Sequence, residues 1–140
     1  LSGHYQPVGT TDSERAFCLI METLHDAWPN QPPPVNELYR LLQETTAGIA
    51  KYGSFNYLLS NGETLFAHCA TDLHYIVRQA PFATAHLIDK DIEIDFNEVT
   101  SPNDRVAVIA TTPLTDNEQW TVMRPAELLM FQDGVPQHPE

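Results

Sequence analysis

Two segments near the start of the chain carry apolar residues at the spacing of amphipathic helices. In residues 12–28 and 35–51 the apolar positions recur every three or four residues, which keeps them on one helical face. These positions are Phe17, Ile20, Met21, Leu24 and Trp28 in the first segment, and Leu38, Leu41, Leu42, Thr45, Ile49 and Tyr52 in the second. Residues 29–34 (PNQPPP) lie between them and cannot be helical, because proline has no N–H to donate. The pattern predicts two helices packed side by side in one layer.

From residue 54 the apolar period changes from the helical one to two, which is typical of strands. Phe55, Tyr57 and Leu59 alternate with other residues up to Asn61-Gly62, a strong hairpin turn signal, and residues 64–70 form the partner strand. Further strands are predicted at 73–78, ended by Pro81, and at 92–96, 105–111, 119–123 and 128–131. Asp133-Gly134 is then a turn, and residues 136–140 a trailing end.

This order of elements predicts an α+β fold. Two helices followed by about six strands fit an arrangement in which helices cover one face of a mostly antiparallel sheet. Residues 57–59 and 106–109 are apolar on both strand faces, so a second sheet or layer should cover the face that the helices leave open. No internal repeat or long linker divides the chain, and we expect residues 1–140 to belong to a single domain.

Composition limits the classes of partner. With 140 residues, 42% hydrophobic and 19% charged, the chain is typical of a globular domain. Its net charge of −12 and its seven scattered Lys and Arg residues argue against nucleic-acid binding. The sequence has no apolar run of membrane-spanning length and no signal-peptide pattern in residues 1–8, so we expect a cytoplasmic protein without a membrane partner.

The most informative stretch is the start of the first predicted helix. Gly9 permits a tight turn, and Thr11 and Glu14 have the spacing of a capping box, so a helix should begin near Asp12. A carboxylate at a helix start is favourable to the helix dipole whatever the protein does. The same carboxylate, if held in one orientation by the turn, is also a good receptor for a ligand ammonium group.

A family resemblance favours the second interpretation. Residues 7–18 (PVGTTDSERAFC) resemble the Thr-Asp-Ser-Glu segment of class II glutamine amidotransferases, in particular their small stand-alone branch. The resemblance continues, in order, at residues 53–62 (GSFNYLLSNG), 78–82 (RQAPF), 94–96 (IDF), 100–106 (TSPNDRV) and 112–120 (TPLTDNEQW). Several matching segments over most of the chain are far more specific than one motif.

The resemblance implies a function and an incomplete site. It implies an α-β-β-α sandwich of the amino-terminal-nucleophile hydrolase type, of which this chain is the carboxy-terminal portion, and it assigns Asp12 to the α-ammonium of glutamine. The family nucleophile is a Cys at the mature amino terminus, whereas this chain begins with Leu1. We therefore expect the upstream half of the domain to be a partner and this portion alone to be inactive. The expected substrate is glutamine or a related γ-glutamyl amide, with no metal or other cofactor; the ammonia acceptor and the oligomeric state, a homo-oligomer included, stay open.

Other candidate groups have ordinary structural explanations. Cys18 and Cys69 form no paired motif and lie on a predicted helix and strand, where a small buried thiol is common. Asn61-Gly62 looks like the Asn-Gly pair of the family oxyanion hole, but it follows the Thr-Asp-Ser-Glu segment instead of preceding it, so we interpret it as a turn. The acidic residues 89–95 are interpreted as a solvated loop and edge strand.

Two rival functions remain. One is a non-catalytic ligand-binding or assembly module on the same scaffold. The other is a small metal-dependent hydrolase, for which His68, Asp72 and His74 offer two imidazoles and a carboxylate across a predicted turn. Spacing across an undefined turn is weak support for a metal site.

Overall fold

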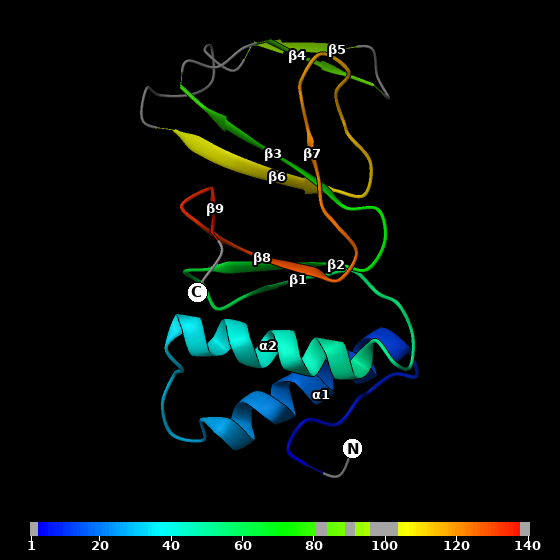
Figure 1. Cartoon of the computed structure of the whole chain (residues 1–140), viewed down its shortest axis with the longest axis vertical. Coiled ribbons are helices and arrows are strands. Elements are labelled where there is room, and N and C mark those ends of the chain that lie inside the picture. The colour runs from blue at the N-terminus through cyan, green and yellow to red at the C-terminus, as the bar shows by residue number, and fades with distance from the viewer. Residues whose placement is uncertain (1–2, 81–83, 89–91, 96–103, 138–140) are drawn as a thin grey trace. The chain divides into compact units, whose positions relative to one another are not determined.

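A computed structural model of the chain describes residues 3–80, 84–88, 92–95 and 104–137 (Figure 1). The described residues form two compact units, one up to Phe55 and one from Asn56 onward, which we describe separately. The predicted strand ends at Pro81 and Phe96, and residues 89–91 and 100–103, lie outside the described residues.

The first unit is a pair of helices. Helix α1 spans Asp12–Ala27 and helix α2 spans Val35–Ile49, and the two contact each other, in agreement with the periodicity. Their buried residues are Cys18 and Ile20 on α1, and Leu38, Leu42, Thr46 and Ile49 on α2.

For two residues the prediction from periodicity is wrong: Phe17 and Tyr52 were assigned to the apolar faces of the helices, but both are exposed. Phe17 is 49% exposed, because the neighbouring Cys18 faces the interior and successive helical residues point about 100° apart. Tyr52 is 93% exposed, because α2 ends at Ile49, earlier than the pattern predicted. The chain then turns, with the Tyr52 N–H donating to the Ile49 carbonyl at 2.9 Å.

The second unit contains antiparallel sheets. In one sheet the order is β1 (Tyr57–Ser60), β2 (Leu65–Cys69), β8 (Glu127–Gln132) and β9 (Val135–Gln137). In a second sheet the order is β6 (Arg105–Ala110), β3 (His74–Gln79) and β7 (Thr121–Val122), and a small third sheet pairs β4 (Thr84–Leu87) with β5 (Ile92–Asp95). Every pairing between these strands is antiparallel.

The two larger sheets pack face to face through an apolar core (Figure 1). The first sheet contributes β2 and β8 side chains and the second contributes β3 and β6 side chains; the buried members of the core are Ala67, Cys69, Leu73, Met123, Leu129 and Phe131. The rings of Tyr75 and Phe131 meet edge to face at 5.4 Å between centroids. The second layer that the two-sided apolar strands predicted is therefore present within this unit.

The predicted fold class, two helices followed by antiparallel strands, is confirmed. The described residues contain nine strands where the sequence indicated about six. The strands β4 and β9 were not predicted: β4 has only four residues, and β9 contains Pro136, which normally argues against a strand. Pro136 is accommodated because β9 lies at the end of its sheet.

Gly134 should tolerate no side chain in the β8–β9 hairpin. Asp133 and Gly134 adopt φ values of 51° and 75°, and a Cβ on Gly134 would lie 3.3 Å from the Arg105 carbonyl oxygen. We expect Gly134→Ala to lower the free energy of unfolding by about 1–2 kcal/mol, measured by urea denaturation. The control is Gly48→Ala on α2, where the added methyl meets no neighbour. It should raise stability by about 0.5–1 kcal/mol, because alanine is the better helix former. Equal effects at both glycines would contradict this account.

Candidate functional site

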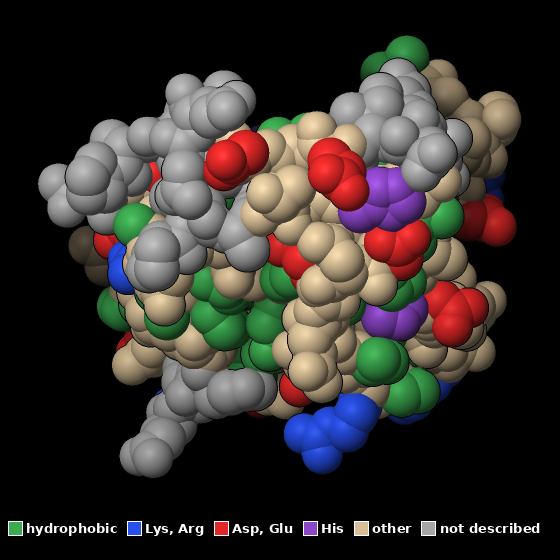
Figure 2. Space-filling model, turned by 90° about the horizontal axis from the view of Figure 1, so that it is seen from above, with side chains coloured by type: hydrophobic (Ala, Val, Ile, Leu, Met, Phe, Trp, Pro, Cys, Tyr) green, Lys and Arg blue, Asp and Glu red, His purple; other side chains and the backbone are tan. Residues whose placement is uncertain are grey.

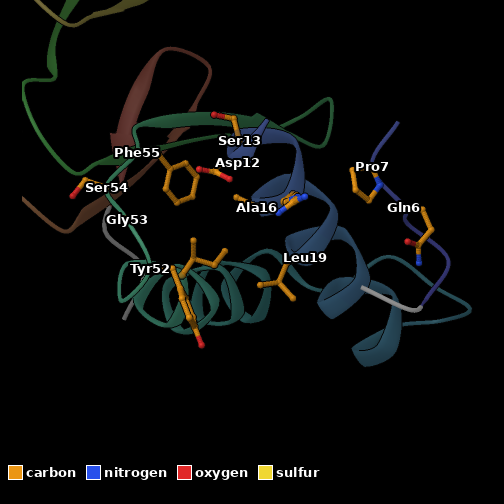
Figure 3. Close-up of a pocket in the computed structure, with 12 residues that line it drawn as sticks. Gln6, Pro7, Asp12, Ser13, Ala16, Leu19, Tyr52, Gly53, Ser54 and Phe55 are labelled. Carbon is orange, nitrogen blue, oxygen red and sulfur yellow. The ribbon is translucent and has the colours of Figure 1, made fainter. Parts of the chain in front are cut away.

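The first unit contains a pocket with a cavity volume of about 690 Å³ (Figure 3). One part of its lining comes from the start of α1 and the segment before it, and another comes from the end of α2 and the residues after it. The lining residues are Gln6, Pro7, Asp12, Ser13, Arg15, Ala16, Leu19, Ile49, Tyr52, Gly53, Ser54 and Phe55. Its volume lies within the range of small-molecule sites, about 300–1,000 Å³.

Asp12 is the first residue of α1 and lines this pocket (Figure 3). The helix begins here because Thr11 has extended backbone angles and its hydroxyl accepts the Glu14 N–H at 3.3 Å. This Thr11 contact is the half of the predicted capping box that the structure contains. Asp12 is thus placed on a capped, well-defined helix end beside a cavity.

The other half of the predicted capping box differs. The Glu14 carboxylate does not return to Thr11 but accepts the N–H groups of Val8 and Gly9, at 2.7 and 2.8 Å. Gly9 makes room for this contact, since a Cβ there would lie 2.6 Å from Glu14 Oε2. Glycine is therefore needed at position 9 because a carboxylate approaches it closely. An unusual backbone angle is not the reason, since only Gly62 and Gly134 among the described glycines have positive φ.

Asp12 and Arg15 place opposite charges in the same pocket. They are three residues apart on α1 and therefore lie on one side of the helix. Both are exposed, and neither side chain forms a hydrogen bond or ion pair within the part of the chain that the structure describes. A carboxylate and a guanidinium that have no partner among the described residues are available to a polar ligand.

Sequence reasoning found Asp12 but missed most of the other lining residues. Arg15 could have been found from its spacing of three residues after Asp12. Tyr52 was assigned to the apolar face of the second helix, whereas it lies beyond the helix end and borders the pocket. Phe55 was assigned to a strand that in fact begins at Tyr57.

Neither cysteine lines this pocket, and both are buried. Cys18 is 7% exposed and Cys69 is 1% exposed, and neither forms a disulfide. The Cys69 thiol is 3.4 Å from the Thr71 carbonyl oxygen, and burial raises its pKa. A buried thiol with a raised pKa is a poor nucleophile, which agrees with a structural role for this residue.

Asn61-Gly62 is a turn, as predicted. The pair connects β1 to β2, Gly62 has φ of 96°, and the Asn61 side-chain oxygen accepts the N–H groups of Glu63 and Thr64 at 3.0 and 2.8 Å. The amide of Asn61 is thus used within its own loop.

His68 and His74, the two histidines considered for a metal site, make contacts with different parts of the chain. His68 is 5% exposed and stacks on Tyr57, with 5.2 Å between ring centroids. His74 Nδ1 lies 3.0 Å from the Thr111 carbonyl oxygen. Across the described ranges, no three His, Cys, Asp or Glu side chains converge as metal ligands, so His68, Asp72 and His74 give the metal-hydrolase alternative no geometric support.

A nearly buried ion pair anchors the segment that precedes β7. Arg78 on β3 donates two hydrogen bonds to the Glu118 carboxylate, at 2.9 and 2.6 Å, and both side chains are nearly buried. Thr115 Oγ1 donates to Glu118 at 2.8 Å, and Trp120 Nε1 donates to Thr115 at 2.9 Å. Because Arg78 donates to it, Glu118 has a lowered pKa.

Figure 2 shows acidic side chains spread over one face, on which the basic side chains appear singly. Within the described ranges, neither helix has the length and apolar character that a bilayer crossing requires.

Comparison with known proteins identifies the family. The model of the class II glutamine amidotransferases matches residues 1–139, so the chain belongs to this family. It is 44% identical over 135 residues to a Haemophilus influenzae protein named "Putative glutamine amidotransferase", covering 96% of this chain and 46% of that protein. It is also 44% identical over 130 residues to "Putative glutamine amidotransferase YafJ" of Escherichia coli, covering 93% of this chain and 51% of that protein.

A solved structure supports the same family assignment. The crystal structure of a "predicted glutamine amidotransferase" from Pseudomonas aeruginosa is 41% identical, with a TM-score of 0.85 over 99% of this chain and 54% of that one. The chain spans about half the length of the curated relatives it matches.

Proposed function

We propose that the complete protein containing this chain is a glutamine amidotransferase that hydrolyses the side-chain amide of glutamine or of a related γ-glutamyl compound. Membership of the class II family supports the activity. The observation that carries the site is the Asp12 carboxylate, which lines a ligand-sized pocket and has no partner among the described residues.

In this proposal Asp12 binds and orients the substrate. Its carboxylate accepts charge-assisted hydrogen bonds from the substrate α-ammonium, a contact worth about 1.5–3 kcal/mol. The other lining residues include apolar side chains, Leu19 and Phe55 among them, which suit the methylene groups of a glutamyl chain.

The bond-breaking groups belong to the upstream half of the domain. The thiolate of an amino-terminal Cys attacks the γ-amide carbon with its own α-amine as base, and backbone donors stabilise the developing oxyanion. The C–N bond breaks, the leaving nitrogen takes up the proton that the α-amine removed from the thiol and departs as ammonia, and a γ-glutamyl thioester remains. Water then opens the thioester, which releases glutamate and returns the thiol. These steps use no metal or other cofactor.

The test is an assay of the complete protein with its amino-terminal Cys. Ammonia and glutamate should form from L-glutamine in equal amounts, and replacement of the terminal Cys by Ala should abolish both. Binding of glutamine without ammonia release, by a protein that retains this Cys, would instead support a non-catalytic module. Absence of both binding and hydrolysis, with L-glutamine and with γ-glutamyl amides, would remove the proposal.

A further inference from the structure

The segment that precedes α1 is attached to the helix by two glutamates at separate points. Glu14 in the first turn accepts the N–H groups of Val8 and Gly9, and Glu22, two turns later, accepts the Tyr5 N–H at 3.0 Å. The Tyr5 hydrogen bond is the main reason that the pKa of Glu22 is lowered. Gln6 and Pro7 lie between these two points, and both line the pocket.

The two glycines of this segment fit the same arrangement. A Cβ on Gly9 would lie 2.6 Å from Glu14 Oε2, and a Cβ on Gly3 would overlap the Glu22 carboxylate. Each carboxylate therefore occupies space that only glycine leaves open. Because the segment is held at two points along α1, it runs alongside the helix between Glu14 and Glu22.

Asp12 lies within the short segment that the Glu14 contacts and the Thr11 cap hold together. Val8 and Gly9 are held by Glu14, Thr11 caps the Glu14 N–H, and Asp12 stands between these anchored residues. A side chain at the first position of an otherwise uncapped helix end frays with it. Here Thr11 caps the helix end, and the Glu14 carboxylate holds the segment that precedes it, so both contacts limit fraying.

From this geometry we propose that Glu14 is a positioning residue for Asp12 and for the Gln6-Pro7 wall of the pocket. The proposal rests on the function proposed above. Glu14 contacts no substrate; it acts by holding the ammonium receptor in the orientation that the substrate needs. Small displacements of a binding group are costly, since about 1 Å can reduce a rate by as much as 100-fold.

A double-mutant cycle in the complete protein tests the link between Glu14 and Asp12. Glu14→Ala should lower kcat/KM for glutamine about tenfold, mainly through KM. In an Asp12→Asn background the same substitution should change kcat/KM by less than about twofold, because the group that Glu14 positions has been removed. Gly9→Ala should reproduce the Glu14→Ala loss, and adding it to Glu14→Ala should have little further effect.

The matched control is Glu37→Ala. Glu37 lies in the first turn of α2, as Glu14 does in α1, but it holds no other segment among the described residues. This variant should leave kcat/KM unchanged. If Glu14→Ala changes only the thermal midpoint, or costs the same in both Asp12 backgrounds, Glu14 is a helix-capping residue and the proposal is wrong.

A second measurement does not depend on activity. In hydrogen exchange of the complete protein, Glu14→Ala should increase the exchange rates of the Val8 and Gly9 amides, and Glu37→Ala should not. Unchanged rates at Val8 and Gly9 would overturn the proposal even if the protein proved to have no amidotransferase activity. Conversely, an inactive wild-type protein with the expected exchange pattern would remove the proposed function but leave the Glu14 contact in place.

Discussion

Replacing Asp12 by Asn in the complete protein should lower kcat/KM for glutamine by about ten- to a hundredfold while the fold stays intact. The substitution keeps the size of the side chain and removes its charge, so the substrate ammonium loses a charge-assisted partner worth about 1.5–3 kcal/mol. The loss should be measured in steady-state kinetics, with circular dichroism and thermal unfolding as checks of the fold.

The matched control for this substitution is Asp26→Asn. Asp26 is an exposed aspartate near the other end of α1, outside the pocket lining and without a partner among the described residues. Its substitution should leave kcat/KM unchanged. An Asp12→Asn variant with normal kcat/KM and reduced stability would show that Asp12 serves the helix end alone.

The largest loss of stability is expected for Arg78→Met. The side chains of Arg78 and Glu118 are 12% and 13% exposed, so removal of the guanidinium leaves a nearly buried carboxylate without its main donor. Breaking one side of a fully buried pair costs about 3–5 kcal/mol, and for this nearly buried pair we expect a loss near the lower end of that range, measured by urea denaturation. The segment before β7 would also lose its anchor, because Thr115 and Trp120 belong to the same hydrogen-bond network.

A double variant separates the ion pair from the packing. Arg78→Met with Glu118→Leu removes both charges and should recover much of the lost stability, since apolar pairs of similar volume often replace buried ion pairs at little cost. If the double variant were no more stable than Arg78→Met alone, the loss would come from packing around Arg78 and not from an unpaired charge.

The same pair gives a dependence of stability on pH. Arg78 lowers the pKa of Glu118 below its usual 4.5, so the folded state favours the charged carboxylate. The resulting stabilisation is complete above the unfolded pKa and is lost as the pH falls through the folded pKa. The wild-type chain should therefore lose this contribution below about pH 4.5, whereas Arg78→Met should not.

The helices and most strands could be predicted from the sequence because their signals are local. Capping residues, the proline-rich loop and the Asn61-Gly62 turn act over a few positions, and the elements follow them closely. The strand β9 could not be predicted, because its pairing with β8 outweighs the usual effect of Pro136 on a strand. The exposure of Phe17 likewise depends on which side of α1 packs, which periodicity alone does not settle.

The candidate site was only partly accessible to sequence reasoning. Asp12 was identified because it combines a helix start with a family motif, and its role as ammonium receptor stays a prediction. Tyr52 and Phe55 were not identified as pocket residues. They line the same pocket as Asp12 because α2 packs against α1, which brings together residues about 40 positions apart in the sequence. Glu14 was assigned to a local box, and only the structure shows that it reaches Val8 and Gly9.

The position of Pro136 also bears on self-association. Strand β9 ends its sheet among the described residues, and an unpaired strand edge can recruit a strand from another molecule. Proline is tolerated in such a strand where its nitrogen points away from the neighbouring strand, so the outward side of β9 lacks a donor at its middle residue. A strand from another molecule would have a carbonyl group at this position with no N–H to accept from. The edge of the sheet at β9 is thereby protected against intermolecular β-pairing and aggregation.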